Sequence, residues 1–339
     1  WSNTTDSSTW GHGGGIYIYS GGHPIFRNVK INGNHVNSNS WNYGAGVFCS
    51  GADATFINVS VTGNSTGKNS IWYYGAGMFF ENCNASLTNV LVSSNTMETG
   101  GNWYYGGGIS VYYSNSPVLI TMMNVTITDN KKIDGTGIYG SGISTESGDT
   151  LIITNSILWN NNPGTEISNA GLLTITNSDV RGGYTGTGNI IGNPAFVSAT
   201  DFHLSASSPC LGAGTLAGAP AFDLDNNPRP LPVATNPDIG CYENSQPNSI
   251  YNLTGENVLV YNYPNPFSAT TVFTISKAIT EGTDYSFIVT DATGRIVKRI
   301  SIISSVTFVF SREDLVNGIY FYQLLNKEKI IAGGKMIIE

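Results

Sequence analysis

Short apolar or alternating runs of four to six residues, separated by glycine or asparagine, fill the first 180 positions of the chain. Such runs predict short β-strands joined by turns, and no segment keeps a helical period long enough for a βα unit. The pattern returns about every 31 residues, which predicts a repeat architecture. A Gly-x-Gly pair marks each copy: Gly13/Gly15, Gly44/Gly46, Gly75/Gly77, Gly106/Gly108 and Gly140/Gly142.

A second block of each copy carries two asparagines six residues apart, as in FRNVKINGN and FINVSVTGN. The first set is Asn28, Asn58, Asn89, Asn124 and Asn155, with Asn177 in a last copy. The second set is Asn34, Asn64, Asn95, Asn130 and Asn161. Asparagine tolerates left-handed turn geometry, and its side-chain amide can hydrogen-bond to an identical neighbour. We therefore predict two structural asparagine ladders.

Residues that return at one phase of such a repeat become vertical neighbours in a solenoid, whose coils lie about 4.8 Å apart. One apolar set is expected to stack inside: Ile16, Val47, Met78, Ile109 and Ile143. A propeller blade would need about 40 residues and four strands, and no leucine lattice is present. The pattern resembles the right-handed parallel β-helix superfamily, which includes pectate lyase-like and many surface proteins. We predict coils over residues 1–200 of an all-β chain.

From Ile190 onward the repeat dissolves into a Pro- and Asp-rich segment. It resembles the C-terminal end of bacterial surface β-helix domains, where F-H-L-x-x-x-S-P, D-x-D-x-x-x-R-P and P-D-I-G-x-Y-E follow one another. The matching residues are Phe202, His203, Leu204, Ser208, Pro209, Asp223, Asp225, Arg229, Pro230, Asp238, Ile239, Gly240, Tyr242 and Glu243. The open end of a solenoid exposes strand edges and core, so we expect residues 201–243 to cap it. A polar linker is expected at 244–256.

Residues 257–339 have a different composition, with more Lys and Arg and no asparagine ladder. Seven short strand-like segments follow one another at close spacing: NVLVYNY, TTVFTIS, YSFIVTD, RIVKRISI, SVTFVF, GIYFYQLL and KMIIE. Strands at this spacing, separated by turns such as DATG and LVNG, predict a small Ig-like β-sandwich.

Motifs within this sandwich resemble the C-terminal sorting domain of the type IX secretion system. They comprise Tyr263, Pro264, Asn265, Pro266, Phe267, Gly294, Asn317, Gly318, Tyr320, Gly334 and Lys335. The resemblance implies export to the medium or outer surface of a Gram-negative bacterium and recognition by translocon or shuttle components. It also implies cleavage in the 244–256 linker. A C-terminal Ig-like binding module is the alternative interpretation.

Charged residues make up only 11% of the chain, so its surface is expected to consist of amides and hydroxyls. The net charge of −8 and the lack of a basic stripe exclude nucleic acid as a partner. The sequence contains no run of 18 apolar residues, so no membrane span is predicted. The chain opens within the repeat without a leader pattern, so we expect a mature chain or a fragment.

Four cysteines are present, and two of them flank one Pro-rich segment. We predict a disulfide between Cys210 and Cys241, as is usual outside the cytoplasm. Cys49 and Cys83 lie in apolar strand sequence, where buried free thiols are the favoured interpretation.

The coils show no nucleophile–base constellation and no Cys/His spacing typical of a metal site, so no catalytic residue is assigned. Asp223 and Asp225 have the alternating oxygen ligands of a calcium loop, but the loop glycine and the bidentate Glu are missing. A capping turn held by its own Asp and Asn hydrogen bonds is therefore favoured, and no cofactor is expected.

Aromatic residues also follow the 31-residue repeat. The set is Trp41, Trp72 and Trp103 with Tyr43, Tyr74 and Tyr105. Such a stack can shield a corner of the core, or it can form a platform for sugar rings. We therefore carry three hypotheses: an adhesin or surface polysaccharide-binding protein, a polysaccharide lyase or hydrolase whose active coils lie outside this sequence, and a structural stalk.

Overall fold

The computed structural model describes residues 3–7, 9–112, 117–133, 138–162, 164–231, 235–244, 258, 260–275, 285–302, 306–327 and 329–339. The chain divides into two compact units, Trp1–Asn244 and Ser245–Glu339. Every regular element in these ranges is a β-strand. The all-β prediction is thereby confirmed. Most of the predicted linker, residues 245–256, falls outside the described residues.

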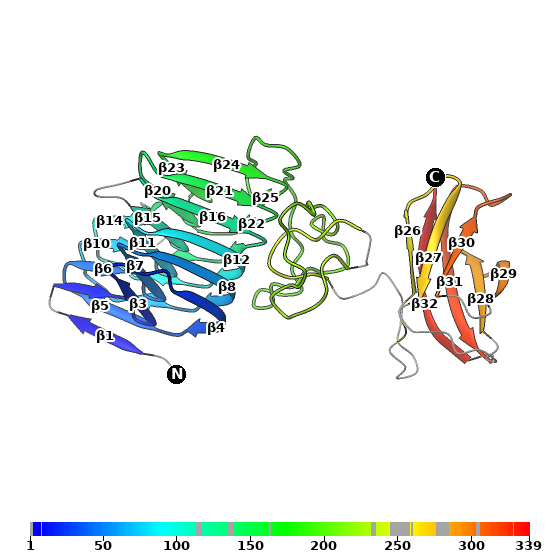
Figure 1. The fold of residues 1–339 in the computed structure, drawn as a ribbon, viewed down its shortest axis with the longest axis horizontal. Coiled ribbons are helices and arrows are strands. Elements are labelled where there is room, and N and C mark those ends of the chain that lie inside the picture. Colours follow the sequence, from blue (N-terminus) through cyan, green and yellow to red (C-terminus); the bar gives the residue numbers. More distant parts are fainter. Residues whose placement is uncertain are drawn as a thin grey trace. The chain divides into compact units, whose positions relative to one another are not determined.

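The first unit is a solenoid of parallel strands in four sheets, which Figure 1 shows stacked coil upon coil. Sheet A contains β1 (Thr4–Ser7), β5 (His35–Ser38), β9 (Ser65–Thr66), β13 (Thr96–Met97) and β18 (Lys131–Lys132). Sheet B contains β2 (Trp10–His12), β6 (Trp41–Tyr43), β10 (Trp72–Tyr74), β14 (Trp103–Tyr105) and β19 (Ile138–Tyr139). The chain visits each sheet once per coil, so neighbours within a sheet come from successive coils.

Sheet C contains β3 (Ile16–Tyr19), β7 (Val47–Ser50), β11 (Met78–Glu81), β15 (Ile109–Tyr112), β20 (Ile143–Thr145) and β23 (Ile167–Asn169). Sheet D contains β4 (Ile25–Asn32), β8 (Asp53–Thr62), β12 (Asn84–Ser93), β16 (Leu119–Met123), β17 (Thr126–Thr128), β21 (Thr150–Thr154), β22 (Ile157–Trp159), β24 (Leu172–Thr176) and β25 (Asp179–Val180). Side chains alternate between core and surface along each strand, because the pleat has a period of two.

The register of sheet C shows that residues at one phase of the repeat are vertical neighbours. Met78 pairs with Val47 on one side and with Ile109 on the other, and Ile109 pairs with Ile143. All four side chains are fully buried in one core cluster. The apolar stack predicted from the repeat is therefore present.

The repeated Gly-x-Gly pair forms the corner between sheets B and C. Gly44 has a φ of +51°, and a Cβ there would lie 2.0 Å from the carbonyl oxygen of Val47. The second glycine, Gly46, meets the next coil, because a Cβ would lie 2.6 Å from the carbonyl oxygen of Gly77. Only glycine fits both constraints, which explains why the pair returns in each coil.

The asparagines of the second set form a continuous, fully buried ladder. The side-chain amide of Asn64 donates to Asn95 at 2.9 Å, that of Asn95 to Asn130 at 2.8 Å, and that of Asn130 to Asn161 at 2.9 Å. The ladder ends at Glu166, whose carboxylate accepts from the Asn161 amide at 2.6 Å. Burial raises the pKa of Glu166 to about 7, against the lowering effect of these hydrogen bonds.

The asparagines of the first set occupy the bends of sheet D, each in the left-handed region. The φ angles are 56°, 54°, 51°, 54°, 51° and 48° for Asn28, Asn58, Asn89, Asn124, Asn155 and Asn177. The Asn58 amide donates to Asn28 at 3.2 Å, and the Asn89 amide to Asn58 at 3.0 Å. From Asn89 onward the amides also donate to the segment that follows the coils, as Asn124 does to the carbonyl of Gly240 at 3.1 Å, while Asn155 still donates to Asn124 at 3.4 Å.

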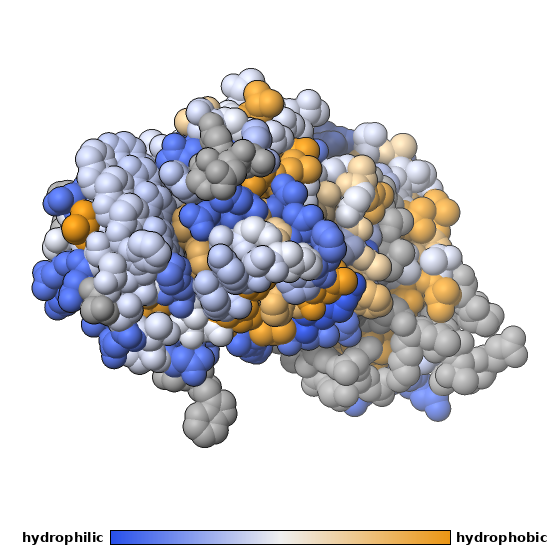
Figure 2. All heavy atoms as spheres, turned by 60° about the vertical axis from the view of Figure 1, so that its left-hand side comes forward, coloured by the Kyte–Doolittle hydropathy of each residue, from blue (hydrophilic) through white to orange (hydrophobic). Residues whose placement is uncertain are grey.

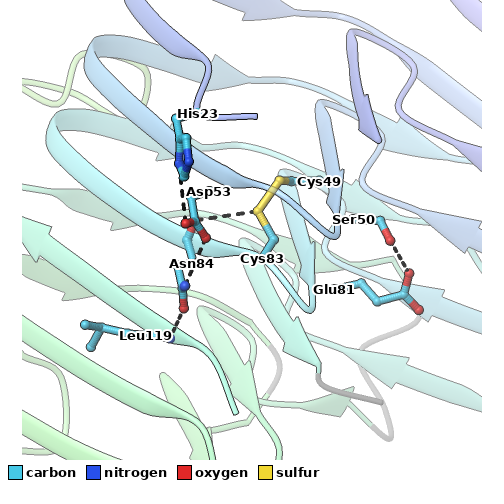
Figure 3. Close-up of a disulfide and its surroundings, with 8 residues drawn as sticks. All are labelled: His23, Cys49, Ser50, Asp53, Glu81, Cys83, Asn84 and Leu119. Atoms are coloured by element: carbon cyan, nitrogen blue, oxygen red, sulfur yellow. Dashed lines mark hydrogen bonds and ion pairs between the residues drawn. A yellow bond between two sulfur atoms is a disulfide. The ribbon is translucent and has the colours of Figure 1, made fainter. Parts of the chain in front are cut away.

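The disulfide lies elsewhere than the sequence predicted. Cys49 and Cys83 are bonded across adjacent coils, with a Cα–Cα distance of 6.1 Å (Figure 3). Cys49 points into the core from β7, and Cys83 follows β11 one coil later, so the coil rise brings the two sulfur atoms within bonding reach. Cys210 and Cys241 are free thiols buried in two separate clusters. Flanking the same Pro-rich segment was therefore the wrong criterion for the pairing.

Residues 201–243 lie along the side of the solenoid at the bends of sheet D. The Asn89 amide donates to the carbonyl of Phe222 at 2.6 Å, and that of Asn155 to Thr215 at 2.8 Å. The segment also contacts the last coil, where the Cys210 thiol lies 3.3 Å from an Asp179 carboxylate oxygen. It therefore spans several coils laterally and does not simply close one end.

Charged motif residues form a buried network that stabilises this segment. The Arg229 guanidinium donates to the carbonyl of Gly240 at 3.2 Å and lies 3.4 Å from the Glu243 carboxylate, with both side chains fully buried. The Asp238 carboxylate accepts from the backbone N–H groups of Gly212 and Asn244, each at 2.7 Å. The network replaces the regular ladders that this segment lacks.

The second unit is a β-sandwich of two antiparallel sheets. One sheet contains β26 (Val260–Tyr263), β27 (Thr270–Ile275) and β30 (Thr307–Ser311). The other contains β29 (Ile296–Ile302), β28 (Tyr285–Asp291), β31 (Gly318–Asn326) and β32 (Lys329–Ile338). These seven strands of the described residues match the seven predicted segments. Phe273, Phe287, Phe310 and Tyr322 fill the core between the sheets.

Candidate functional site

Outward-facing side chains of sheets B and C form one aromatic surface of the solenoid, called here the aromatic face. Trp72 pairs in register with Trp41 and Trp103, and Tyr74 with Tyr43 and Tyr105. The structure thus brings all six predicted aromatic residues together. The sequence analysis missed the other members of this face, which are Trp10, His12, Tyr17 and Tyr139, together with Phe48 and Phe79, which are buried among the neighbouring rings.

The rings of the aromatic face stack on one another. Trp41 and Trp72 have centroids 5.1 Å apart and planes within 6°, and Trp72 and Trp103 lie 5.5 Å apart within 14°. Tyr74 and Tyr105 stack at 4.9 Å. Because the rings lie along the column, their faces contact neighbouring rings and their edges face outward. Trp72, which stacks on Trp41 and on Trp103, therefore offers no free ring face to a ligand.

Burial governs the ionisation of the aromatic face. It raises the pKa of Tyr43, and the nearby Glu81 carboxylate raises that pKa further. It likewise raises the pKa of Tyr105, and the Glu146 carboxylate adds to that effect. Burial also lowers the pKa of His12, which stacks on Tyr43 at 5.1 Å. At neutral pH the phenols keep their protons and His12 is uncharged.

A second outward column of sheet C runs beside the aromatic face. Ser50 pairs in register with Tyr19 and Glu81, and Glu81 pairs with Tyr112. Glu146 extends the column beyond the strand, because it directly follows Thr145, the last residue of β20 and the register partner of Val111. The Ser50 hydroxyl donates to the Glu81 carboxylate at 2.8 Å (Figure 3). Comparison of repeats could not find this column, since its residue types differ from coil to coil.

A hollow of about 560 Å³ adjoins the start of this column. Its polar lining includes Tyr19, His23, Ser50, Asp53 and Asn82. Figure 3 shows His23 directed at Asp53, with 3.4 Å between the ring nitrogen and the carboxylate oxygen. Over the molecular face in Figure 2, hydrophilic and near-neutral side chains surround smaller apolar areas. Such a surface of hydroxyls, amides and aromatic edges is suited to hydroxyl-rich ligands.

Asp223 and Asp225, the calcium candidate, have hydrogen-bond partners within the chain. The Asp223 carboxylate accepts from the backbone N–H groups of Asp225 at 2.9 Å, Asn227 at 2.7 Å and Glu243 at 2.8 Å. Asp225 lies 2.7 Å from the imidazole of His203. These bonds make the pair part of the loop network, as the capping-turn interpretation proposed.

The described part of the chain holds no group of three or more His, Cys, Asp or Glu side chains arranged to bind a metal ion. Within the same residues, no helix is long and apolar enough to cross a membrane.

Several motif residues of the sandwich meet where β31 begins and β32 ends. The Asn265 side chain accepts from the N–H of Ile337 at 2.8 Å and donates to the carbonyl of Lys335 at 3.2 Å. The N–H of Phe267 donates to the carbonyl of Ile337 at 3.1 Å. Arg312, which the sequence analysis missed, donates to the Asn317 side chain at 3.0 Å.

The remaining motif residues have local structural roles. The carbonyl of Pro264 accepts from the Thr271 hydroxyl at 2.7 Å, and the Tyr320 hydroxyl donates to the carbonyl of Val316 at 2.8 Å. Gly318 pairs with Ile338. Asn265–Pro266 is a cis peptide bond. Tyr263 ends β26, and its side chain falls outside the described residues.

Two motif glycines border a hollow of about 570 Å³ beside β31 and β32. Gly294 has a φ of +87° in the turn that begins at Asp291. Gly334 faces the Tyr322 ring, since a Cβ there would lie 2.3 Å from its hydroxyl oxygen. That hydroxyl donates to the carbonyl of Val260 at 2.8 Å and links the two sheets. Gly334 is thus required by packing.

The two units define a class of protein, a parallel β-solenoid followed by a separate antiparallel sandwich. Comparison with known families assigns both. The family model for a right handed beta helix region matches residues 2–191, and the model for a secretion system C-terminal sorting domain matches residues 261–339. The chain belongs to the right-handed β-helix family and carries a type IX secretion sorting domain. No curated protein and no solved structure matches it.

The sorting domain makes this chain a secreted or cell-surface protein that interacts with the secretion system. The β-helix family alone does not specify an activity, because one fold carries many functions. Any role of the solenoid must therefore be argued from its own surface.

Proposed function

We propose that this chain is an adhesin or carbohydrate-binding protein of the outer surface of a Gram-negative bacterium, and that it binds surface polysaccharide at the aromatic face. The observation that carries the proposal is the continuous set of outward aromatic columns beside a column of Ser, Tyr and Glu side chains. Aromatic groups with adjacent hydroxyl and carboxylate groups suit the mixed apolar and hydroxyl surface of a sugar.

Export through translocon and shuttle components that recognise residues 257–339 is part of the same proposal. Asn265 lies where β32 ends and Asn317 is exposed just before β31, which supports a recognition surface there. The core disulfide between Cys49 and Cys83 supports maturation outside the cytoplasm, where disulfides persist. We also propose processing within 244–256, most of which lies outside the described residues.

A structural stalk is the second candidate, and the ring stacking favours it. Trp72 lies between Trp41 and Trp103, so its two faces are covered by other rings. Stacking of this kind stabilises adjacent coils whether or not a ligand binds. A lyase has no comparable support: the outward columns of sheets B and C, as described, carry no Lys or Arg to act as a base.

The test compares an exposed aromatic residue with an exposed apolar residue elsewhere. Trp103 is 40% exposed on the aromatic face, and Leu172 is 71% exposed on sheet D. On a panel of immobilised polysaccharides, we expect Trp103→Ala to weaken binding at least about tenfold, the effect of losing roughly 1.4 kcal/mol. Leu172→Ala should bind like the unmodified chain.

Thermal unfolding of both variants controls for damage to the solenoid. Binding that survives Trp103→Ala unchanged would place the ligand elsewhere. If the unmodified chain binds no polysaccharide while remaining folded, the stalk hypothesis replaces this one.

A further inference from the structure

The Ser, Tyr and Glu column of sheet C supplies one hydrogen-bonding side chain per coil. Tyr19, Ser50, Glu81 and Tyr112 lie at consecutive register positions, and Glu146 extends the column as the residue directly after Thr145, the partner of Val111. Coils repeat at about the spacing of paired strands, 4.8 Å. A pyranose ring in an extended chain has nearly the same length. A linear polysaccharide parallel to the solenoid axis therefore meets an equivalent position at each successive sugar.

The adjacent ring edges repeat along the same direction. The centroid spacings are 5.1 Å from Trp41 to Trp72 and 5.5 Å from Trp72 to Trp103. Because the ring faces contact one another, a ligand touches the edges, which carry C–H and N–H groups. The edge of an aromatic ring is its electropositive part. A hydroxyl-rich chain can accept from these edges while its hydroxyls donate to the neighbouring column.

Charge restricts the ligand further. Glu81 and Glu146 are the acidic members of these outward columns, and the columns as described contain no Lys or Arg. Burial lowers the pKa of the one imidazole present, His12, so it does not offset them at neutral pH. A carboxylated sugar placed here would meet like charge at short range. An uncharged or amino-bearing sugar would not.

We infer, on the basis of the proposed function, that the aromatic face binds a linear polysaccharide without acidic sugars, aligned with the solenoid axis at one sugar per coil. Its hydroxyls donate to the Glu81 and Glu146 carboxylates, which accept hydrogen bonds and do not donate them. The two glutamates thus determine which polymers bind, and the aromatic edges contribute contact area.

Two polymers with the same backbone test the charge restriction. The full chain is run by affinity electrophoresis at low salt through hydroxyethyl cellulose, which is uncharged, and through carboxymethyl cellulose, which is acidic. We expect at least tenfold tighter binding to the uncharged polymer and a smaller ratio in high salt, because ions screen the repulsion. Equal binding, or tighter binding to the acidic polymer, would overturn the inference while leaving the proposed function intact. Binding to neither polymer nor to the wider polysaccharide panel would overturn both.

Substitutions assign the preference to the two glutamates. In the double variant Glu81→Gln and Glu146→Gln, we expect the ratio between the two polymers to fall toward one. Glu98→Gln removes the same charge from a position between sheets A and B and serves as the matched control. A ratio that persists in the double variant would overturn the role given to the glutamates.

Ligand length tests the alignment. Uncharged oligosaccharides of the polymer that binds should gain affinity with each added sugar until they cover the five column positions. A plateau at two sugars would show a local pocket and overturn the axial arrangement. Thermal unfolding curves recorded for each variant distinguish a lost contact from a lost fold.

Discussion

The coils and the segment that follows them belong to one compact unit, yet they are held together differently. In the coils, neutral amides repeat: Asn64, Asn95 and Asn130 each donate to the asparagine of the next coil. In residues 201–243, the buried charged side chains form single, non-repeating contacts, such as the ion pair between Arg229 and Glu243. A repeated neutral ladder spreads stability over many equivalent bonds, whereas a non-repeating ionic network concentrates it in a few residues.

The difference matters because the segment covers the bends of several coils. Asn89 and Asn155, which continue the ladder of the bends, give their amides to carbonyls of Phe222 and Thr215. The ionic network therefore supports the coils as well as its own loops. Four substitutions or changes of condition, taken from the largest expected effect to the smallest, sharpen this comparison.

The largest effect is expected from Arg229→Met, which leaves the Glu243 carboxylate buried without its partner. We expect a loss of about 3–5 kcal/mol in the free energy of unfolding of the solenoid, measured by denaturant titration. Arg27→Met, at an exposed position of β4, removes the same charge and should cost less than about 0.5 kcal/mol. If both substitutions lower the free energy of unfolding by the same amount, the stability of residues 201–243 is not concentrated in the buried ionic network.

Removing the disulfide tests the coils. Cys49 and Cys83 close a loop with a sequence separation of 34, and losing it is expected to cost about 3–4 kcal/mol by loop entropy. The Cys49→Ala and Cys83→Ala double variant is compared with Cys210→Ala, which removes a buried free thiol. A reductant should destabilise the unmodified chain and Cys210→Ala, but not the double variant. If the reductant leaves the unmodified chain unaffected, the assigned disulfide is wrong.

Interrupting the buried ladder should cost less than either change. In Asn95→Ala, the amide groups of Asn64 lose their acceptor and the carbonyl of Val61 loses a donor. We expect a loss of about 2–3 kcal/mol, because buried polar groups are left unpaired. Asn102→Ala, at an exposed position, is the matched control and should be nearly neutral. A neutral Asn95→Ala would mean that the ladder is not a source of stability.

The smallest effect is a dependence on pH at the end of this ladder. The pKa of Glu166 is raised to about 7 in the folded chain by burial, from 4.5. The Glu166 carboxyl therefore holds its proton more tightly in the folded chain than in the unfolded chain. The stability that this provides is complete below about pH 4.5 and is lost as the pH rises through 7.

Glu166→Gln removes this titration. Its stability relative to the unmodified chain should improve by on the order of 1–2 kcal/mol between pH 5.5 and 7.5. Denaturant titrations at both pH values measure the change. A difference between variant and unmodified chain that does not depend on pH would contradict the raised pKa.

The comparison also explains what could be predicted from the sequence. The ladders and the apolar stack were predictable because Asn58 and Asn89, or Val47 and Met78, occupy the same phase of a repeat. The pairing of Cys49 with Cys83 was not, because it joins two different phases across a coil boundary. The lateral position of residues 201–243 likewise depends on tertiary contacts that leave no periodic trace.

The candidate site shows the same division. The positions of Trp41, Trp72 and Trp103 followed from their spacing, but the orientation of their rings did not. Ring orientation depends on side-chain packing between coils. The Glu81 and Glu146 column remained hidden for another reason, since its residue types differ from coil to coil.

The central claim is that the C-terminal unit delivers the solenoid to the outside of the cell. The most direct measurement is to delete residues 257–339 and follow the solenoid by fractionation of a host with an active type IX system. The account predicts that the truncated chain remains folded but inside the cell envelope, while the full chain reaches the surface or the medium. Normal export of the truncated chain would contradict it.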